Sequence, residues 1–358
     1  TYQMDPNYAP GPNNEFDLTL QRSLNNFMVL ELGYIGRTAS RLYMPVQLNQ
    51  VPYMMPLGGQ TFAAAWAALS NEKLGGGAIT PQPWFETALA GSSYCTGQAS
   101  CTAGMMAKLG SDVANQKVTT LWNAIQPTFA MGNVTASTSQ VQSLFFWSNG
   151  AHSNYNAGFA ALHVRNYNGL TLDTNLTWSH ALGNKAENQD DDTTTSNSFD
   201  PNYDYGTLRF DRKLVLNILG SYNLPFGRGD DSLAHRLVRN WTISPIFSWF
   251  GGQPLHVATG SSQEWGQTSA LGADAILTAP DTFGNAVHAA SGTSGTVATT
   301  GNPAKGGTGL NLFADPAAVY GAFRPAILGV DNTSTGGMIR GMGHWNMDFA
   351  LARKRQVR

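Results

Sequence analysis

The chain has 358 residues, a formal net charge of -2 and only 12% charged residues, about half the usual share of a soluble domain. The balanced charge argues against a nucleic-acid partner, and no run of eighteen apolar residues could form a helical membrane span. Glycine (39 residues) and aromatic side chains (11%) are plentiful. The first residue is not Met and no signal peptide precedes ordered-looking sequence, so we expect a fragment or a processed chain.

Two runs with alternating apolar and polar residues lie near the start of the chain. Apolar side chains occupy every second position over residues 16–20 and again over 28–34, and about four polar residues join the two runs. A period of two is typical of β-strands with two different faces. The sequence therefore predicts a hairpin.

Residues 37–152 lose this alternation and are predicted to form a long extracellular loop with structure of its own. Apolar spacings of three and four predict short helices over 60–74 and 111–125. Cys95 and Cys101 are expected to form a local disulfide, with two free thiols as the alternative. Four tryptophans of this region are expected to pack in a loop core, although stacking on sugars or peptides is the alternative: Trp66, Trp84, Trp122 and Trp147.

The strand with the clearest alternation covers residues 170–182. It follows the Asn168-Gly169 dipeptide, a strong hairpin signal, and a preceding strand over 155–165. At thirteen residues it exceeds the ~5–6 of soluble strands and is long enough for a tilted crossing of a bilayer, which needs ~9–11. A half-buried strand of a soluble sandwich would alternate in the same way.

Three more strands are predicted, over residues 213–224, 241–250 and 345–351. A second long loop, rich in Gly, Ser, Thr and Ala, is predicted over 260–337. The polar stretch 186–203 contains Asp190, Asp191 and Asp192, which are expected to be a solvated acidic loop. A weak Ca²⁺ site is the alternative, because calcium binds several carboxylate oxygens.

The seven predicted strands are joined by links that alternate between shorter and longer, which is the construction of an outer-membrane β-barrel. The fold class predicted is therefore all-β: a partial transmembrane antiparallel barrel with helices in its extracellular loops. Barrels of this class have even strand numbers and no open edge in lipid, so seven strands predict part of a larger barrel. Candidates to face the lumen are polar residues opposite the apolar set: Asp173, Asn175, Thr177, Asn217, Ser221, Asn223, Asn346 and Asp348.

Sequence motifs of common enzyme classes are absent, including G-x-S-x-G, the P-loop and H-E-x-x-H. The seven histidines contain no pair at H-x-H or i,i+4 spacing. We therefore expect no catalytic activity and no cofactor.

An ordered set of short motifs extends along the chain. It includes Asp5-Pro6-Asn7-Tyr8, Glu31-Leu32-Gly33-Tyr34, Thr177-Trp178-Ser179-His180, Phe210-Asp211-Arg212, Leu224-Pro225-Phe226-Gly227 and Gly251-Gly252-Gln253-Pro254. In this order the motifs resemble the barrel of an Oar-like TonB-dependent receptor. The resemblance implies that residues 1–358 belong to the C-terminal part of a larger barrel of about 22 strands. The plug domain, the segment that contacts TonB and the last strands would then lie outside this chain.

The sequence thus predicts part of an outer-membrane receptor that binds a large extracellular ligand of unknown identity and imports it through a plugged barrel. Expected partners are outer-membrane lipid, the plug domain and the TonB complex. One alternative is a passive porin or surface adhesin, and a second is a secreted soluble β-rich binding protein.

Overall fold

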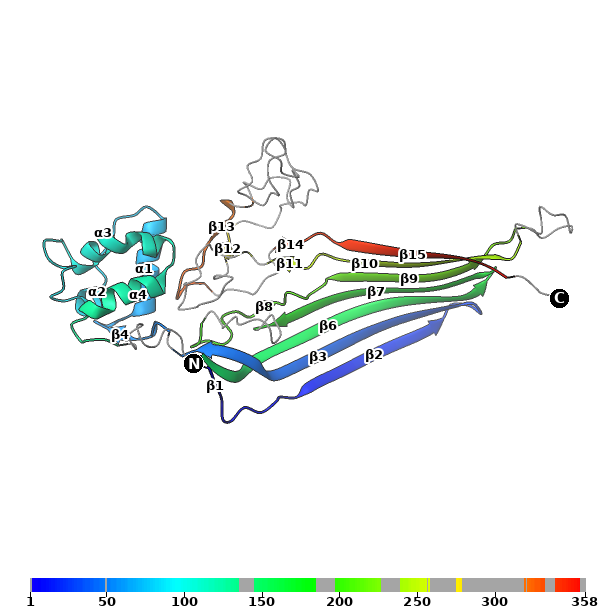
Figure 1. The fold of residues 1–358 in the computed structure, drawn as a ribbon, viewed down its shortest axis with the longest axis horizontal. Helices are drawn as coiled ribbons and strands as arrows, with labels where there is room; N and C mark the ends of the chain where they lie inside the picture. Colours follow the sequence, from blue (N-terminus) through cyan, green and yellow to red (C-terminus); the bar gives the residue numbers. More distant parts are fainter. Residues whose placement is uncertain are drawn as a thin grey trace, which may run out of the picture.

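A computed structural model describes the chain over residues 2–48, 50–134, 145–184, 197–226, 239–255, 257, 275–278, 319, 321–331 and 339–354. One long antiparallel sheet dominates it, and a group of helices lies at one end of that sheet (Figure 1).

Seven long strands form the sheet: β2 (Asn13–Ser23), β3 (Met28–Gln47), β6 (Phe145–Tyr167), β7 (Leu170–Gly183), β9 (Leu214–Asn223), β10 (Trp241–Phe250) and β15 (His344–Arg353). Their order is β15-β10-β9-β7-β6-β3-β2, so each long strand pairs with the next one along the chain. Two short strands complete the nine-stranded sheet: β1 (Tyr2–Met4), parallel to β6, and β8 (Gly206–Thr207), beside β7. The predicted antiparallel β architecture is confirmed, and within the described residues the sheet is open, with β2 and β15 at its edges.

The links between the long strands lie at the two ends of the sheet, the shorter ones at one end and the longer ones at the other (Figure 1). At the end remote from the helices, which we call the turn end, the links are 24–27, 168–169 and 224–240. At the opposite end, the loop end, the links are 48–144, 184–213 and 251–343. Each link at the turn end is therefore shorter than the link at the loop end that follows it along the chain, as the sequence predicted.

The predicted first loop is too wide at both of its boundaries. Residues 37–47 continue β3, and β6 already begins at Phe145, so the link is shorter than 37–152. Register shifts between Ala39 and Leu42 and between Leu42 and Met44, with Arg41 at φ 53°, break the period of two. A strand irregular in this way does not show alternation in its sequence.

Alternation along the paired strands gives the sheet an apolar face and a polar face. The apolar face remains strongly exposed: Leu18 is 75%, Trp178 65%, Trp345 66% and Phe349 59% accessible. Water-soluble monomers rarely expose large apolar side chains along a whole sheet face, so this face requires a non-aqueous neighbour. Aromatic residues lie on this face toward both ends: Tyr34, Trp178 and Trp345 toward the loop end, and Tyr167, Tyr222 and Trp241 toward the turn end.

The helices belong to a compact unit over residues 50–134, which we call the helical domain. It contains the strand pair β4 (Pro56–Leu57) and β5 (Gln60–Thr61), the helices α1 (Phe62–Leu74), α2 (Pro83–Ala88), α3 (Cys101–Ala114) and α4 (Val118–Ile125), and the 3₁₀ helix η1 (Gln126–Thr128). Its core is aromatic, and Trp66, Trp84 and Trp122 are at most 1% exposed. Among the described residues, no helix is both long and apolar enough to cross a membrane.

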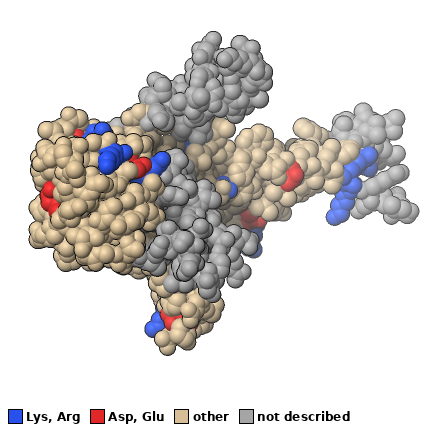
Figure 2. Space-filling model, turned by 60° about the vertical axis from the view of Figure 1, so that its left-hand side comes forward, with Lys and Arg blue, Asp and Glu red and all other residues tan. Residues whose placement is uncertain are grey.

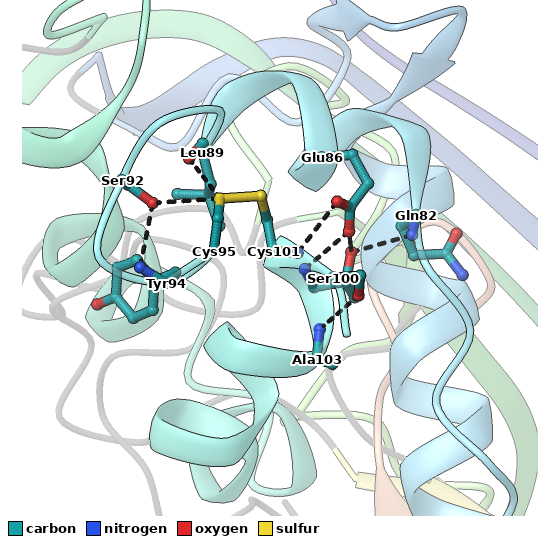
Figure 3. Close-up of a disulfide and its surroundings, with 10 residues drawn as sticks. Gln82, Glu86, Leu89, Ser92, Tyr94, Cys95, Ser100, Cys101 and Ala103 are labelled. Atoms are coloured by element: carbon teal, nitrogen blue, oxygen red, sulfur yellow. Dashed lines mark hydrogen bonds between the residues drawn. A yellow bond between two sulfur atoms is a disulfide. The ribbon is translucent and has the colours of Figure 1, made fainter. Parts of the chain in front are cut away.

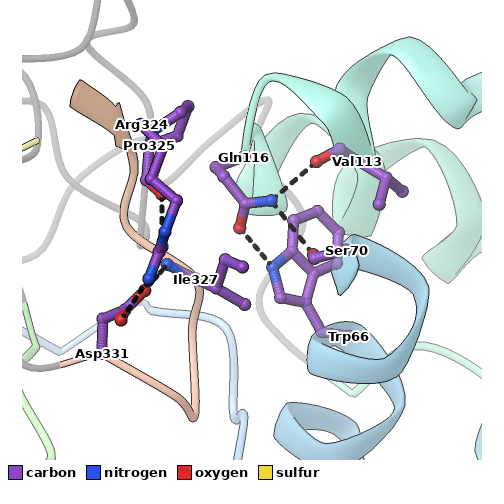
Figure 4. Close-up of polar contacts among 8 residues, drawn as sticks. All are labelled: Trp66, Ser70, Val113, Gln116, Arg324, Pro325, Ile327 and Asp331. Carbon is purple, nitrogen blue, oxygen red and sulfur yellow. Dashed lines mark hydrogen bonds and ion pairs between the residues drawn. The ribbon is translucent and has the colours of Figure 1, made fainter. Parts of the chain in front are cut away.

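The predicted helix over 111–125 is wrong in one respect, because it is two helices. Gln116 has a φ of 55°, which ends α3 before α4 begins. Its buried side chain accepts a hydrogen bond from Trp66 Nε1 at 2.9 Å and donates to Ser70 Oγ at 3.0 Å (Figure 4). These tertiary contacts hold Gln116 in a conformation that is unfavourable for most residues.

Two further strand pairs lie at the loop end. Strand β11 (Pro254–Leu255) pairs with β14 (Ile339–Arg340), and β12 (Ala275–Leu277) pairs with β13 (Phe323–Pro325). Both pairs lie in the 251–343 link, which contains the predicted loop over 260–337.

Gly33 packs closely against an aromatic ring of the neighbouring strand. It lies directly opposite Phe159, and a Cβ on Gly33 would lie 2.2 Å from Cε1 of that ring. Gly33→Ala is expected to displace the ring and lower the free energy of unfolding by about 1–2 kcal/mol, measured by urea unfolding in lipid vesicles. Gly158→Ala is the matched control, because the nearest non-neighbouring atom to its Cβ is 4.0 Å away; equal losses at both positions would contradict the ring contact.

Candidate functional site

Two parts of the molecule are placed to meet a solute: the polar face of the sheet and the loops at its loop end. The polar face runs along all seven long strands, so any solute passing along it would remain beside hydrogen-bonding groups. The loops lie where the polar face ends, and they include the helical domain (Figure 1).

A row of amide and hydroxyl side chains crosses the middle of the polar face. Asn175 lies opposite Asn217, which lies opposite Ser248, and Ser248 lies opposite Asn346. Ser248 Oγ donates to Asn217 Oδ1 at 2.9 Å, and Thr177 Oγ1 donates to Asn175 Oδ1 at 2.9 Å. The row thus spans four neighbouring strands, and the Ser248 bond joins two of them.

All eight residues predicted to face the lumen lie on this one polar face. Besides the central row, the cross-strand neighbours are Asp173 with His163, Thr177 with Val215, Ser221 with Thr171, Asn223 with Thr242, and Asp348 with Ile246. Residues directly opposite each other share a face. Leu219 and Ile246 are apolar exceptions on the same face, so the wall is mixed rather than uniformly polar.

Two carboxylates and a histidine meet on the polar face, a cluster that the sequence pattern did not predict. His163 Nδ1 lies 2.6 Å from Asp173 Oδ1, and His163 Nε2 lies 3.8 Å from Glu31 Oε2. Gln21 Nε2 donates to Glu31 Oε2 at 2.7 Å, which joins β2 to the group. The alternation of β3 puts Glu31 among the polar positions and could have identified it, but the approach of His163 required the register between β3 and β6.

A buried ion pair fixes the strands and links at the loop end. The Asp211 side chain is fully buried, and one of its oxygens is paired with Arg340 Nη2. Its other oxygen accepts a hydrogen bond from the backbone N–H of Ala181 in β7 at 2.6 Å. The next residue, Arg212, donates to the carbonyl of Gly251 at 3.0 Å. The Phe210-Asp211-Arg212 motif, in the 184–213 link, therefore ties β7 to the 251–343 link.

The link between β7 and β9 contacts the helical domain. Asn197 Nδ2 donates to the Tyr53 hydroxyl at 2.8 Å, and the Ser198 N–H donates to Gln50 Oε1 at 2.8 Å. The rings of Tyr53 and Phe199 meet edge to face, with centroids 5.4 Å apart. These contacts join two links that are far apart in the sequence.

The link between β10 and β15 also docks on the helical domain. Arg324 forms a bidentate ion pair with Asp331, at 2.6 and 2.8 Å, and Asp331 accepts a hydrogen bond from the Ile327 N–H at 2.8 Å (Figure 4). Burial raises the pKa of Asp331, but these hydrogen bonds more than offset it and leave the pKa below its ordinary value. The turn held in this way presents Ala326 and Leu328 to the helical core.

The start of α3 is held by a disulfide and a carboxylate. Cys95 is disulfide-bonded to Cys101, the first residue of the helix (Figure 3). Glu86 of α2 accepts hydrogen bonds from the Cys101 N–H at 3.0 Å and from the Thr102 N–H at 2.8 Å. Ser100 adds an N-cap bond from the Ala103 N–H at 3.0 Å.

Glu86 makes the stability of the helical domain dependent on pH. Partial burial raises its pKa, but hydrogen bonds from Thr102, Cys101 and Ser100 bring the pKa below its ordinary value of 4.5. A carboxyl with a depressed folded-state pKa stabilises the fold above its unfolded-state pKa and loses this effect as the pH falls through the folded-state value. We expect the melting temperature of the helical domain to fall below about pH 4.5.

Glu86→Gln should weaken this acid dependence and lower stability at neutral pH, as measured by near-ultraviolet circular dichroism during heating. Asp112→Asn, which removes a carboxylate nearer the other end of α3, is the control and should keep the acid dependence. An unchanged pH profile in the Glu86 variant would contradict its role.

Other predicted binding features contribute less to the site. Trp66, Trp84 and Trp122 are buried in the helical core, as expected. The expectation is wrong for Trp147, which lies in β6 and stacks on Tyr43 of β3 with centroids 4.3 Å apart. The calcium candidates Asp190, Asp191 and Asp192 lie outside the described residues. In the part of the chain that is described, no group of three or more His, Cys, Asp or Glu side chains is arranged to hold a metal ion.

A solved structure resembles part of this chain. The chain is similar to the outer membrane transporter YddB from Escherichia coli, with 8% sequence identity and a TM-score of 0.30 over 72% of this chain. It spans 23% of the length of that protein. No curated protein sequence matches the chain.

The family comparison covers the whole chain: the model of the outer membrane beta barrel domain matches residues 1–358. This match agrees with the antiparallel sheet, its exposed apolar face and its aromatic residues toward both ends. The chain therefore belongs to the outer membrane beta barrel domain family and is located in the outer membrane.

Proposed function

We propose that this chain is part of an Oar-like TonB-dependent receptor that binds a large ligand outside the cell and imports it through the barrel. One observation carries the proposal: a polar face follows the sheet along its length, and an assembly of docked loops lies at one end of it. A solute bound at the loops would have hydrogen-bonding groups beside it along its path.

The two faces of the sheet define how it would lie in the membrane. Hydrocarbon would cover the apolar face, because lipid chains are the neighbour that exposed leucine and tryptophan side chains require. The polar face would then line the bore. In lipid, the edge strands β2 and β15 would pair with further strands, since unpaired backbone groups in hydrocarbon are costly.

The docked loops supply a binding surface on the extracellular side. Two separate links hold the helical domain, through Tyr53 on one side and through the turn containing Ala326 and Leu328 on the other. A ligand that contacted several of these links could change how they dock. Coupling to transport would pass through a plug domain and the TonB complex, the partners that the sequence resemblance implies.

The proposal is tested with the full-length protein in planar lipid bilayers and with a purified TonB C-terminal domain. A receptor closed by a plug should show no steady open-channel conductance and should bind the TonB domain. Steady conductance without TonB binding would replace the proposal with a passive porin. The absence of both conductance and TonB binding would favour a surface adhesin.

A further inference from the structure

Basic residues are concentrated at the turn end of the sheet. In the sequence, residues 224–240 and 352–358 contain seven Lys or Arg and two Asp, a net charge of +5 in a chain whose total is -2. Among the described residues, this group consists of Arg239, Arg353 and Lys354. Figure 2 shows Lys and Arg gathered at the end of the molecule remote from the helical domain.

Strand pairing places Arg353 beside Trp241 on the apolar face of the sheet. Arg353 lies opposite Trp241 across the β10–β15 pair, and its guanidinium lies 5.8 Å from the centroid of the indole. The Lys354 N–H donates to the carbonyl of Asn240 at 3.0 Å, which fixes the end of β15 beside the turn that contains Arg239. Arg353 therefore lies over the indole of Trp241, and Lys354 follows it where β15 ends.

The depth of Arg353 in the membrane follows from the residues that precede it on the apolar face of β15. Trp345, Met347, Phe349 and Leu351 are 52–66% exposed, and Arg353 is the next residue on the same face. Eight residues of strand rise about 27 Å, or about 20 Å along the membrane normal at a tilt of about 40°. The apolar band of such barrels is about 25 Å tall, so with Trp345 at its upper boundary the Arg353 backbone lies about 5 Å from the lower boundary, within reach of the lipid phosphates for a long side chain.

We propose that Arg353, which lies beside Trp241, and Lys354, which follows it at the end of β15, bind the headgroup phosphate of an anionic phospholipid in the periplasmic leaflet. The turn end faces the periplasm, because short turns of outer-membrane barrels are periplasmic. Arg353 supplies a planar fork of donors that suits phosphate oxygens, and Lys354 adds a second positive charge. The exposed apolar residues above Arg353 give the acyl chains a surface to cover, which a free phosphate ion would not use.

The test measures lipid binding to the full-length protein in detergent by native mass spectrometry, with phosphatidylglycerol and phosphatidylcholine of identical acyl chains. The wild type should bind phosphatidylglycerol more tightly than phosphatidylcholine. The double variant R353Q/K354Q should bind phosphatidylglycerol about 25-fold more weakly, about fivefold for each cation removed. Its binding of phosphatidylcholine should change little.

The control K73Q/K108Q removes the same charge from the helical domain and should bind phosphatidylglycerol like the wild type. Equal losses in the two double variants, or equal binding of the two lipids by the wild type, would overturn the proposal. Full competition by soluble glycerol phosphate would also overturn it, because that result identifies a free-phosphate site.

If R353Q/K354Q does not fold, two other measurements test the lipid-binding proposal. The swapped variant R353K/K354R keeps both charges and should retain most of the preference for phosphatidylglycerol. Added salt should weaken wild-type binding of phosphatidylglycerol and leave phosphatidylcholine unaffected, because screening acts on the charged headgroup. A preference insensitive to salt would overturn the proposal.

Discussion

Asp211→Ala is expected to lower the free energy of unfolding of the sheet by about 3–5 kcal/mol, because removing one partner leaves Arg340 as an uncompensated buried charge. The Asp211 side chain is fully buried, and that of Arg340 is 17% exposed. The variant also removes the acceptor of the Ala181 N–H in β7. Urea unfolding in lipid vesicles, followed by tryptophan fluorescence, measures the loss.

The exposed ion pair between Arg37 and Glu15 is the matched control for this experiment. Both side chains are about half exposed, at 51% and 53%, and their atoms lie 2.8 Å apart. Glu15→Gln should change stability by about 0–1 kcal/mol, because solvent screens such pairs. If Asp211→Ala had an equally small effect, the ion pair at the loop end would not be what fixes these strands and links.

Trp84→Ala is expected to unfold the helical domain while leaving the sheet folded. Trp84 is fully buried, contacts the Phe62 ring at a centroid distance of 4.8 Å and donates to the Met55 carbonyl at 3.1 Å. Truncation of a buried tryptophan typically costs about 3–5 kcal/mol. Limited proteolysis should then cut within residues 50–134, and the strands should stay protected.

Trp178→Ala provides the control for this loss of an indole. Trp178 is 65% exposed on the apolar face of β7, so its removal should leave the proteolysis of the helical domain unchanged. Simultaneous loss of the sheet in the Trp84 variant would show that the helical domain and the sheet unfold together.

The period of two in the sequence was sufficient to predict all seven long strands. The predicted strand over 241–250 agrees with β10, and the polar and apolar sets of 170–182 lie on opposite faces of β7. Alternation is readable here because the two faces of each strand meet different surroundings along the whole span. The same signal failed for the outer parts of β3 and β6, where register shifts interrupt the alternation.

Short-range patterns were less informative for the loops. The apolar spacing predicted the buried face of α4, but the end of α3 depends on Gln116 and its contacts with Trp66 and Ser70. The spacing of Cys95 and Cys101 was compatible with a disulfide and with free thiols, and the structure has the disulfide. Local sequence leaves such choices open because partners distant along the chain decide them.

The amino-acid sequence by itself determined which residues form the membrane-spanning strands and which side chains share a face, because a β-strand alternates its side chains whatever it pairs with. Only the tertiary structure decided which distant groups meet. Asp211 and Arg340 are 129 positions apart, and Glu31 meets His163 only through the register of β3 and β6. These contacts depend on how the links at the loop end dock and on strand register, and neither leaves a periodic signal in the sequence.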